Sequence, residues 1–76
     1  MSDHPVLVDA QGLLCPMPVI RLQQAAADAE SGDEIEVIAT DPGVRADIPA
    51  WCRVHGHHVV DIQEEEITIR VRVRLR

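Results

Sequence analysis

The chain of 76 residues contains no lysine, no phenylalanine and no tyrosine, and it has a single tryptophan, Trp51. Without lysine, an active-site Schiff base and the lysine of a phosphate-binding P-loop are excluded. Without Phe or Tyr, the core must be built from Val, Ile, Leu and Ala, with Met as a filler. The apolar runs are only a few residues long, far short of the roughly 20 residues that cross a membrane, so no membrane association is expected.

Positive charge and cysteine are also scarce. Seven basic residues, all of them Arg, stand against 13 acidic ones and give a net charge of −6. Because an acidic protein repels phosphate backbones, we expect no direct binding to nucleic acid. The two cysteines, and an opening that lacks the pattern of a secretory leader, predict a cytoplasmic protein whose thiols are packed or reactive rather than bridged.

The pattern along the chain predicts one domain over residues 1–76 with the element order βαβαββ. Strands are expected over residues 5–10, 33–40, 59–63 and 65–76, and helices over residues 15–31 and from about 44 to 54 or 55. In the last strand, apolar residues alternate with Thr68 and with the arginines at 70, 72, 74 and 76. Such alternation leaves one face of the sheet polar. We therefore expect an α+β fold, a two-layer sandwich with both helices on one face of a four-stranded sheet.

Both predicted helices have an apolar face at three- and four-residue spacing. The face of the first helix, which Gly32 is expected to end, consists of Val19, Leu22, Ala26 and Ala29. The face of the second consists of Val44, Ile48, Trp51, Cys52 and His55. Pro49 falls inside the second segment, so it either kinks that helix or follows a fresh helix start at Asp47.

Cys15 precedes two closely spaced prolines, Pro16 and Pro18. Pro16 disfavours helical geometry at Cys15 and itself fits the first position of a helix. Pro18 falls in the first turn, whose N–H groups have no intrahelical partner. Cys15 is therefore predicted at the N-cap, where the positive end of the helix dipole stabilises a thiolate and lowers the thiol pKa. The alternative is an inert cysteine packed beside a helix start.

The surroundings of Cys15 in the sequence contain no Cys-X-X-Cys pattern and no obvious His or Asp that would act as a base. A reactive thiol without such partners suits thiol exchange better than hydrolysis. A persulfide, R–S–SH, would be loaded and unloaded there by partner enzymes.

Two stretches of the chain resemble the TusA/SirA/YedF family of small sulfur-carrier proteins. Residues 9–18, DAQGLLCPMP, resemble the family's opening D-x-x-G-x-x-C-P-x-P. Further on, DP at 41–42, DIP at 47–49, WC at 51–52 and GH at 56–57 resemble its second motif. The resemblance extends from about residue 7 to residue 75.

This resemblance implies a βαβαββ sandwich with a mixed sheet, in agreement with the pattern above. It implies that Cys15 receives sulfur from a cysteine desulfurase or a rhodanese-like protein and passes it on as a persulfide. The supporting motif residues would be Asp9, Gly12, Pro16 and Pro18. The acceptor proteins it implies serve tRNA thiolation, molybdenum-cofactor synthesis or sulfur oxidation. We expect a monomer without cofactor or metal, a persulfide carrier rather than a stand-alone enzyme.

Recognition of partner proteins is expected at Met17, Arg45 and Asp47. Met17 lies between the two prolines, where it either meets a partner or makes a local packing contact. The family commonly has an Arg directly before its D-I-P motif, but that place is Ala46 here and the Arg is one position earlier. On a helix this turns the side chain by about 100°. The subfamily, and with it the partner, is left open.

The remaining candidate residues have ordinary structural interpretations. Cys52 is predicted as a packed thiol, and His55, His57 and His58 as solvated side chains rather than metal ligands. The arginines of the last strand are expected to pair with Glu34, Glu36 and Asp61 on neighbouring strands. Their functional alternative is a docking strip for an acidic partner or an RNA.

Two function classes follow from these patterns. The first is a sulfur carrier that uses Cys15. The second is a non-catalytic regulatory or interaction module, in which the turn at Cys15 is structural and the Arg-rich face binds a partner. A thiol–disulfide oxidoreductase is disfavoured because no resolving cysteine lies near Cys15.

Overall fold

The computed structural model describes residues 4–76, which form four strands and two helices in the order βαβαββ. The elements are β1 (Val6–Ala10), α1 (Met17–Ala27), β2 (Glu34–Ala39), α2 (Val44–His55), β3 (His58–Glu65) and β4 (Thr68–Arg74). The expectation that the chain has no secretory leader rests partly on residues 1–3, which lie outside the described residues. Neither helix in residues 4–76 is long and apolar enough to span a membrane.

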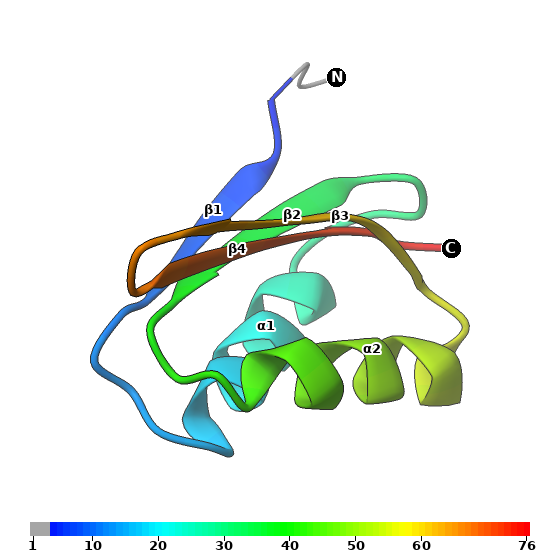
Figure 1. Cartoon of the computed structure of the whole chain (residues 1–76). Coiled ribbons are helices and arrows are strands. Elements are labelled where there is room, and N and C mark those ends of the chain that lie inside the picture. Colours follow the sequence, from blue (N-terminus) through cyan, green and yellow to red (C-terminus); the bar gives the residue numbers. More distant parts are fainter. Residues whose placement is uncertain (1–3) are drawn as a thin grey trace.

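The strands form one mixed sheet with the order β1-β2-β4-β3. β1 runs parallel to β2, whereas β4 is antiparallel to both β2 and β3. Both helices lie on the same side of this sheet (Figure 1). The predicted two-layer α+β sandwich with a mixed four-stranded sheet is therefore confirmed. We call the sheet face without helices the open face.

Alternation along the two central strands builds the core between sheet and helices. Every second residue of β2 and β4 is buried, and aligned pairs such as Val37 and Val71 form rows across the sheet. The helices close the core with Leu22 of α1 and with Val44, Ile48 and Cys52 of α2. The predicted helix faces are confirmed at these buried positions. His55, which the helical spacing placed on the apolar face, is exposed.

The predicted first helix, residues 15–31, is too long at both ends. The first helical hydrogen bond runs from the Ile20 N–H to the Pro16 carbonyl at 3.1 Å, so the helix begins at Met17 and Pro16 is its N-cap. At the other end, Asp28 and Ala29 donate to carbonyls only three residues back. These tighter turns end α1 at Ala27, before Gly32 is reached.

The two last strands also differ from their predicted bounds. β3 is longer than expected, because Glu65 belongs to it and pairs with Thr68 across a two-residue turn. Glu66 has a positive φ of 53° in that turn, and Ile67, predicted on the apolar face of a continuous strand, is exposed. No Asn-Gly or Asp-Gly pair marks this turn in the sequence, and its alternating pattern runs straight through it.

α2 is one continuous helix through Pro49. The fresh helix start at Asp47 is therefore wrong, and Asp47 is instead an acidic residue of the first turn, where it complements the helix dipole. α2 ends at Gly56, whose φ of 77° is the left-handed conformation that glycine adopts at little cost.

Candidate functional site

Cys15 lies in the loop that connects β1 with α1, and its side chain is exposed. The Leu13 N–H donates to the Ala10 carbonyl at 3.2 Å, and the Gly12 N–H donates to Thr40 Oγ1 at 2.9 Å. Gly12 has a φ of 78°, which suits a residue without a Cβ. The loop therefore bends sharply after β1 and is tied to the end of β2.

The motif places Cys15 one residue farther from the helix than predicted. Because Pro16 is the N-cap of α1, Cys15 precedes the cap, and the Met17 N–H donates to the Leu14 carbonyl at 2.9 Å. The Cys15–Pro16 peptide bond is cis. Pro18 is buried in the first turn of α1, where its missing N–H leaves no hydrogen bond unmade.

Asp41 holds the backbone of Cys15 from the other side. The Cys15 N–H donates to Asp41 Oδ2 at 2.8 Å, and the Gly43 N–H donates to Asp41 Oδ1 at 3.1 Å. These two donors lower the pKa of the Asp41 carboxyl below its usual value. One carboxylate thus fixes both the cysteine loop and the turn that leads into α2.

Asp47 acts on the thiol itself, which contradicts the predicted thiolate. A hydrogen bond with Asp47 is the main cause that raises the pKa of Cys15, followed by desolvation and by the negative charges of Asp47 and Asp41. The helix dipole was expected to lower this pKa, whereas the shift of the Cys15 pKa is upward. At neutral pH the free protein therefore presents Cys15 mainly as a protonated thiol.

Sequence reasoning missed Asp41 and the contact of Asp47 with the thiol. Because β1 and β2 are parallel, the loops that follow them meet at the same edge of the sheet. This rule could have placed the two N-terminal ends of the helices together, and with them Cys15, Asp41 and Asp47. The two motifs lie far apart in the sequence, so local patterns did not predict that they are close together in the fold.

The other predicted motif residues have identifiable local roles. Asp9 Oδ1 accepts hydrogen bonds from the Gln11 backbone N–H at 3.1 Å and from its side-chain amide at 3.2 Å. Asp9 therefore orders the start of the loop, and neither of these hydrogen bonds involves Cys15. Met17 is partly exposed at the first position of α1, two residues after Cys15, as expected.

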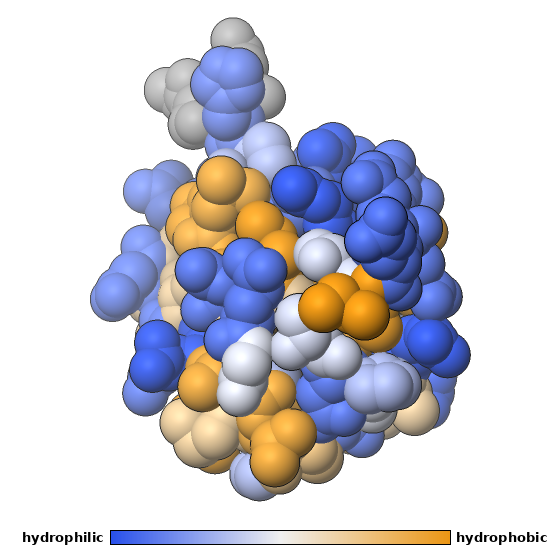
Figure 2. Space-filling model, turned by 60° about the vertical axis from the view of Figure 1, so that its left-hand side comes forward, coloured by the Kyte–Doolittle hydropathy of each residue, from blue (hydrophilic) through white to orange (hydrophobic). Residues whose placement is uncertain are grey.

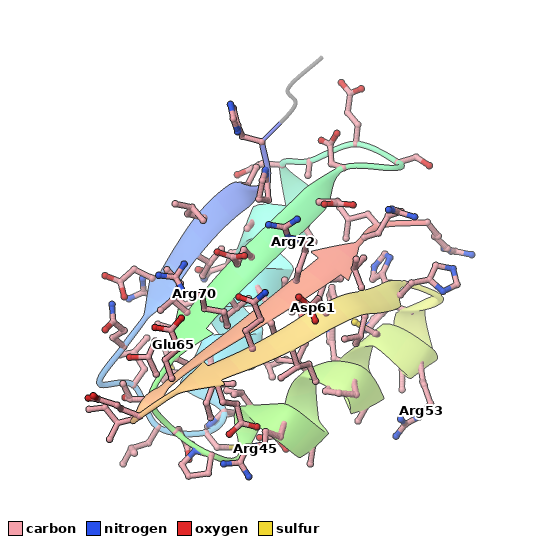
Figure 3. All side chains as sticks on the ribbon, turned by 45° about the horizontal axis from the view of Figure 1, so that its top comes forward. Arg45, Arg53, Asp61, Glu65, Arg70 and Arg72 are labelled. Atoms are coloured by element: carbon pink, nitrogen blue, oxygen red, sulfur yellow. The ribbon has the colours of Figure 1, made fainter. Side chains whose placement is uncertain are left out.

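Arg45 forms an ion pair with a glutamate of β3. Its Nε lies 3.1 Å from Glu64 Oε2 of β3, and both side chains are about half exposed. Figure 3 shows Arg45 at the start of α2. The partner contact predicted for Arg45 is therefore separate from the contacts of the thiol.

Apolar side chains close to Cys15 in the sequence are exposed on the surface. Leu14 is strongly exposed, and Met17 and Ile20 are exposed by somewhat more than a third. Figure 2 looks onto the end of the molecule where the loop of Cys15 lies, and shows hydrophobic patches between hydrophilic ones. Cys15 is thus presented from a surface that combines apolar contact area with two carboxylates.

The second cysteine and the histidines lie elsewhere. Cys52 is buried in the core, and burial raises the pKa of its thiol. Trp51 packs against His55 and His57, with ring centroids 5.1 and 4.9 Å apart. Within residues 4–76, no three His, Cys, Asp or Glu side chains are grouped as ligands of a metal ion.

The arginines of β4 form a ladder with the glutamates of β2 on the open face. Arg70 and Arg72 contact Glu36 at 3.0 and 3.4 Å, and Arg74 contacts Glu34 at 2.9 Å. The expected pairing with Glu34 and Glu36 is therefore confirmed for these three arginines, while Arg76 lies beyond the end of β4. Asp61 lies opposite Arg72 in the register (Figure 3), but it takes part in none of the ion pairs found within residues 4–76, so the pairing expected for Asp61 is wrong. Asp61 instead accepts a hydrogen bond from the Gln63 side chain.

Comparisons with known proteins agree on one family. The family model of sulfurtransferase TusA matches residues 6–74. The sulfur carrier protein TusA of Pseudomonas paraeruginosa is 48% identical over 64 residues, which cover 82% of this chain and 81% of that protein. The protein of the same name from Pseudomonas syringae pv. syringae is 46% identical over 67 residues, covering 88% and 80%. A solved SirA-like protein from Desulfitobacterium hafniense has a TM-score of 0.81 at 27% identity and covers 91% of this chain and 95% of its own.

Proposed function

Because the chain belongs to the TusA family of sulfur carriers, we propose that its 76 residues act as one domain that carries sulfane sulfur as a persulfide on Cys15. The observation that supports Cys15 most directly is the contrast between the two thiols. Cys15 is exposed on a loop that is hydrogen-bonded to the start of α2, whereas Cys52 is enclosed in the core. A carrier needs a sulfur atom that a partner can reach without unfolding the domain.

The proposed loading step transfers one sulfur atom without a change in the total oxidation state. Cys15 Sγ attacks the outer sulfur of a donor persulfide, R–S–SH, and a new S–S bond forms while the bond to the donor sulfur breaks. The donor leaves as a thiolate, which takes up the proton released by Cys15. The products are R–SH and a persulfide on Cys15, and attack by an acceptor on the outer sulfur reverses the roles.

Supporting roles follow from the loop geometry. Asp9 and Gly12 shape the segment that leaves β1, while Pro16 and Pro18 fix the start of α1 directly after Cys15. Met17 offers an apolar contact beside the reacting sulfur for an incoming partner. A terminal sulfur placed on such an exposed loop extends farther into solvent than the thiol does, which favours its transfer.

The partners proposed for this site are proteins. A cysteine desulfurase or a rhodanese-like protein would supply the sulfur in the cytoplasm, and an acceptor protein in tRNA thiolation, molybdenum-cofactor synthesis or sulfur oxidation would take it. The step above needs no cofactor on this chain. The competing role, a binding module that uses the Arg-rich open face, has less support because Glu34 and Glu36 already pair with these arginines.

The proposal is tested by loading the protein with a cysteine desulfurase and free cysteine, followed by intact mass measurement without reductant. Transfer of one sulfur adds about 32 Da. We expect this addition in the wild type and in Cys52→Ala, and its loss in Cys15→Ala. Equal sulfur uptake by Cys15→Ala would reject Cys15 as the carrier.

A further inference from the structure

Two neighbouring residues that directly follow β2, Thr40 and Asp41, hold the loop of Cys15 at two points. Thr40 Oγ1 accepts the Gly12 N–H at 2.9 Å, and Asp41 Oδ2 accepts the Cys15 N–H at 2.8 Å. These bonds span 28 and 26 residues of sequence. They are possible because the parallel strands β1 and β2 send both loops out from the same edge of the sheet (Figure 1). We call the two side-chain contacts the loop clamp.

The carboxylate of Asp41 suits its place because both of its oxygens are acceptors. Its second oxygen, Oδ1, accepts the Gly43 N–H at 3.1 Å, so each oxygen serves one backbone amide. An asparagine has one acceptor oxygen, and its NH₂ group would face the other N–H as a second donor. A carboxylate therefore satisfies both amides, whereas the side chain of Asn satisfies only one of them.

The loop clamp adds long-range contacts to a loop whose other bonds are local. The Leu13 N–H donates to the Ala10 carbonyl at 3.2 Å, and the Met17 N–H donates to the Leu14 carbonyl at 2.9 Å. These two bonds shape the turns, but they do not tie the loop to another part of the fold. The side chain of Cys15 is nevertheless exposed, so its backbone is held while its sulfur stays accessible.

Transfer of sulfur between two proteins depends more on direction than reaction with a small reagent does. In the loading step, the Cys15 sulfur must lie in line with the S–S bond of the donor while the two proteins are docked. A displacement of about 1 Å can lower the rate of such a step by about 100-fold. A small reagent, by contrast, approaches an exposed sulfur from any open side. A held loop therefore matters far more for a protein donor than for a small one.

We propose that Thr40 and Asp41 are positioning residues for sulfur transfer, which act through the backbone of Gly12 and Cys15 and hold the Cys15 sulfur in the direction that a docked partner protein needs. This proposal rests on the carrier role of Cys15. Neither side chain takes part in the exchange of sulfur. Loss of either contact leaves the thiol accessible, but it lets the loop adopt directions in which the sulfur does not meet the donor.

The test measures initial rates of loading by a cysteine desulfurase and free cysteine at several concentrations of the carrier, with the added sulfur quantified by intact mass. Thr40→Val removes the hydroxyl but keeps a branched side chain, so kcat should fall at least about threefold while KM stays within about twofold of the wild type. Thr40→Ser keeps the hydroxyl and should restore most of the wild-type kcat. Asp41→Asn should also lower kcat, and Thr68→Val, the same change on β4, should leave it unchanged.

Alkylation of Cys15 by iodoacetamide separates the position of the sulfur from its accessibility. Thr40→Val changes no charge, so its alkylation rate should stay within about twofold of the wild-type rate. A wild-type kcat of loading in Thr40→Val, or an alkylation rate that falls as much as loading does, would overturn the proposal.

Amide exchange measures the loop clamp without any sulfur. The Gly12 N–H should exchange with deuterium faster in Thr40→Val than in the wild type or Thr40→Ser, and an unchanged rate would also overturn the proposal. A wild type that takes up no sulfur would reject the carrier role itself, whereas equal loading of wild type and Thr40→Val would reject only the role of the clamp. Thermal unfolding confirms that each variant is folded, and Asp41→Asn decides the outcome if Thr40→Val is not.

Discussion

The backbone N–H of Cys15 donates to Asp41 Oδ2 at 2.8 Å, across 26 residues of sequence. Because of this bond, the position of Cys15 depends on the loop before α2 as well as on the loop before α1. Asp41 also accepts the Gly43 N–H, so the same carboxylate orders the entry to α2. The sulfur of Cys15 is therefore exposed, while its backbone is held.

Asp41→Ala should release the loop of Cys15 without unfolding the domain. The variant removes the acceptor of the Cys15 and Gly43 N–H groups, so both amides should exchange with deuterium faster than in the wild type. Amide exchange followed by NMR measures this directly. Glu30→Ala, in the loop that follows α1, should leave the exchange rates of both amides unchanged. If Asp41→Ala exchanges these amides at the wild-type rate, the bond does not order the loop.

His57 should make stability depend on pH. Burial, followed by the charges of His55, Arg76 and His58, lowers the pKa of His57 below 6.5, and its Nδ1 accepts the Arg76 N–H at 3.2 Å. Because the folded state disfavours the protonated form, this contribution is present above pH 6.5 and is lost as the pH falls through the folded pKa. Unfolding can be followed by the fluorescence of Trp51, because the chain has no other Trp and no Tyr.

The measurement compares melting temperatures at pH 7.5 and pH 5 for wild type and His57→Gln. The wild type should lose more stability on acidification than the variant, whose side chain does not titrate. A loss of the same size in both proteins would assign the pH dependence to other groups.

Ile48→Ala should destabilise the domain by about 2–5 kcal/mol, because it leaves a cavity between α2 and the sheet. Ile48 is fully buried, whereas Val54 on the same helix is 79% exposed. The matched variant Val54→Ala should therefore stay within about 0.5 kcal/mol of the wild type. Urea unfolding followed by Trp51 fluorescence gives both values. If the two variants lose similar amounts of stability, the face of α2 that carries Ile48 does not pack against the sheet.

Glu36→Gln should have a small effect that salt removes. Glu36 pairs with Arg70 and Arg72, whose side chains are 44% and 41% exposed, and exposed pairs contribute less than about 1 kcal/mol each. The free energy of unfolding should fall by less than that amount at low salt and by less still at 0.5 M salt. Sulfur uptake should be unchanged, and a loss of uptake here would favour the alternative in which the open face binds a partner.

The element order and the two layers of the fold could be predicted from the sequence, but the ends of the helices and strands could be predicted only in part. Alternation in β2 and β4 and the helical spacing of the buried residues are local signals, so the layers followed from them. The ends of α1 and the turn at Glu66 depend on hydrogen bonds and on a backbone conformation that the residue types do not demand. Apolar and polar residues alternate throughout residues 65–76, so the pattern gave no sign of that turn.

The position of Cys15 at a helix start could be predicted from the sequence, but the direction in which its pKa shifts could not. Two prolines after Cys15 mark a helix start, which is a local signal. The raised pKa of the thiol depends on Asp47, which reaches Cys15 only through the crossover between parallel strands. A local argument from the helix dipole therefore gave the wrong direction.

The central claim is tested most directly by locating the transferred sulfur. Trypsin cleaves after the arginines at 21, 45 and 53, so Cys15 falls in residues 1–21 and Cys52 in residues 46–53. After loading with a desulfurase and labelled cysteine, and after blocking with an alkylating reagent, the added sulfur of about 32 Da should appear only in the peptide of residues 1–21. Its appearance in residues 46–53, or in neither peptide, would contradict the assignment of Cys15 as the sulfur carrier.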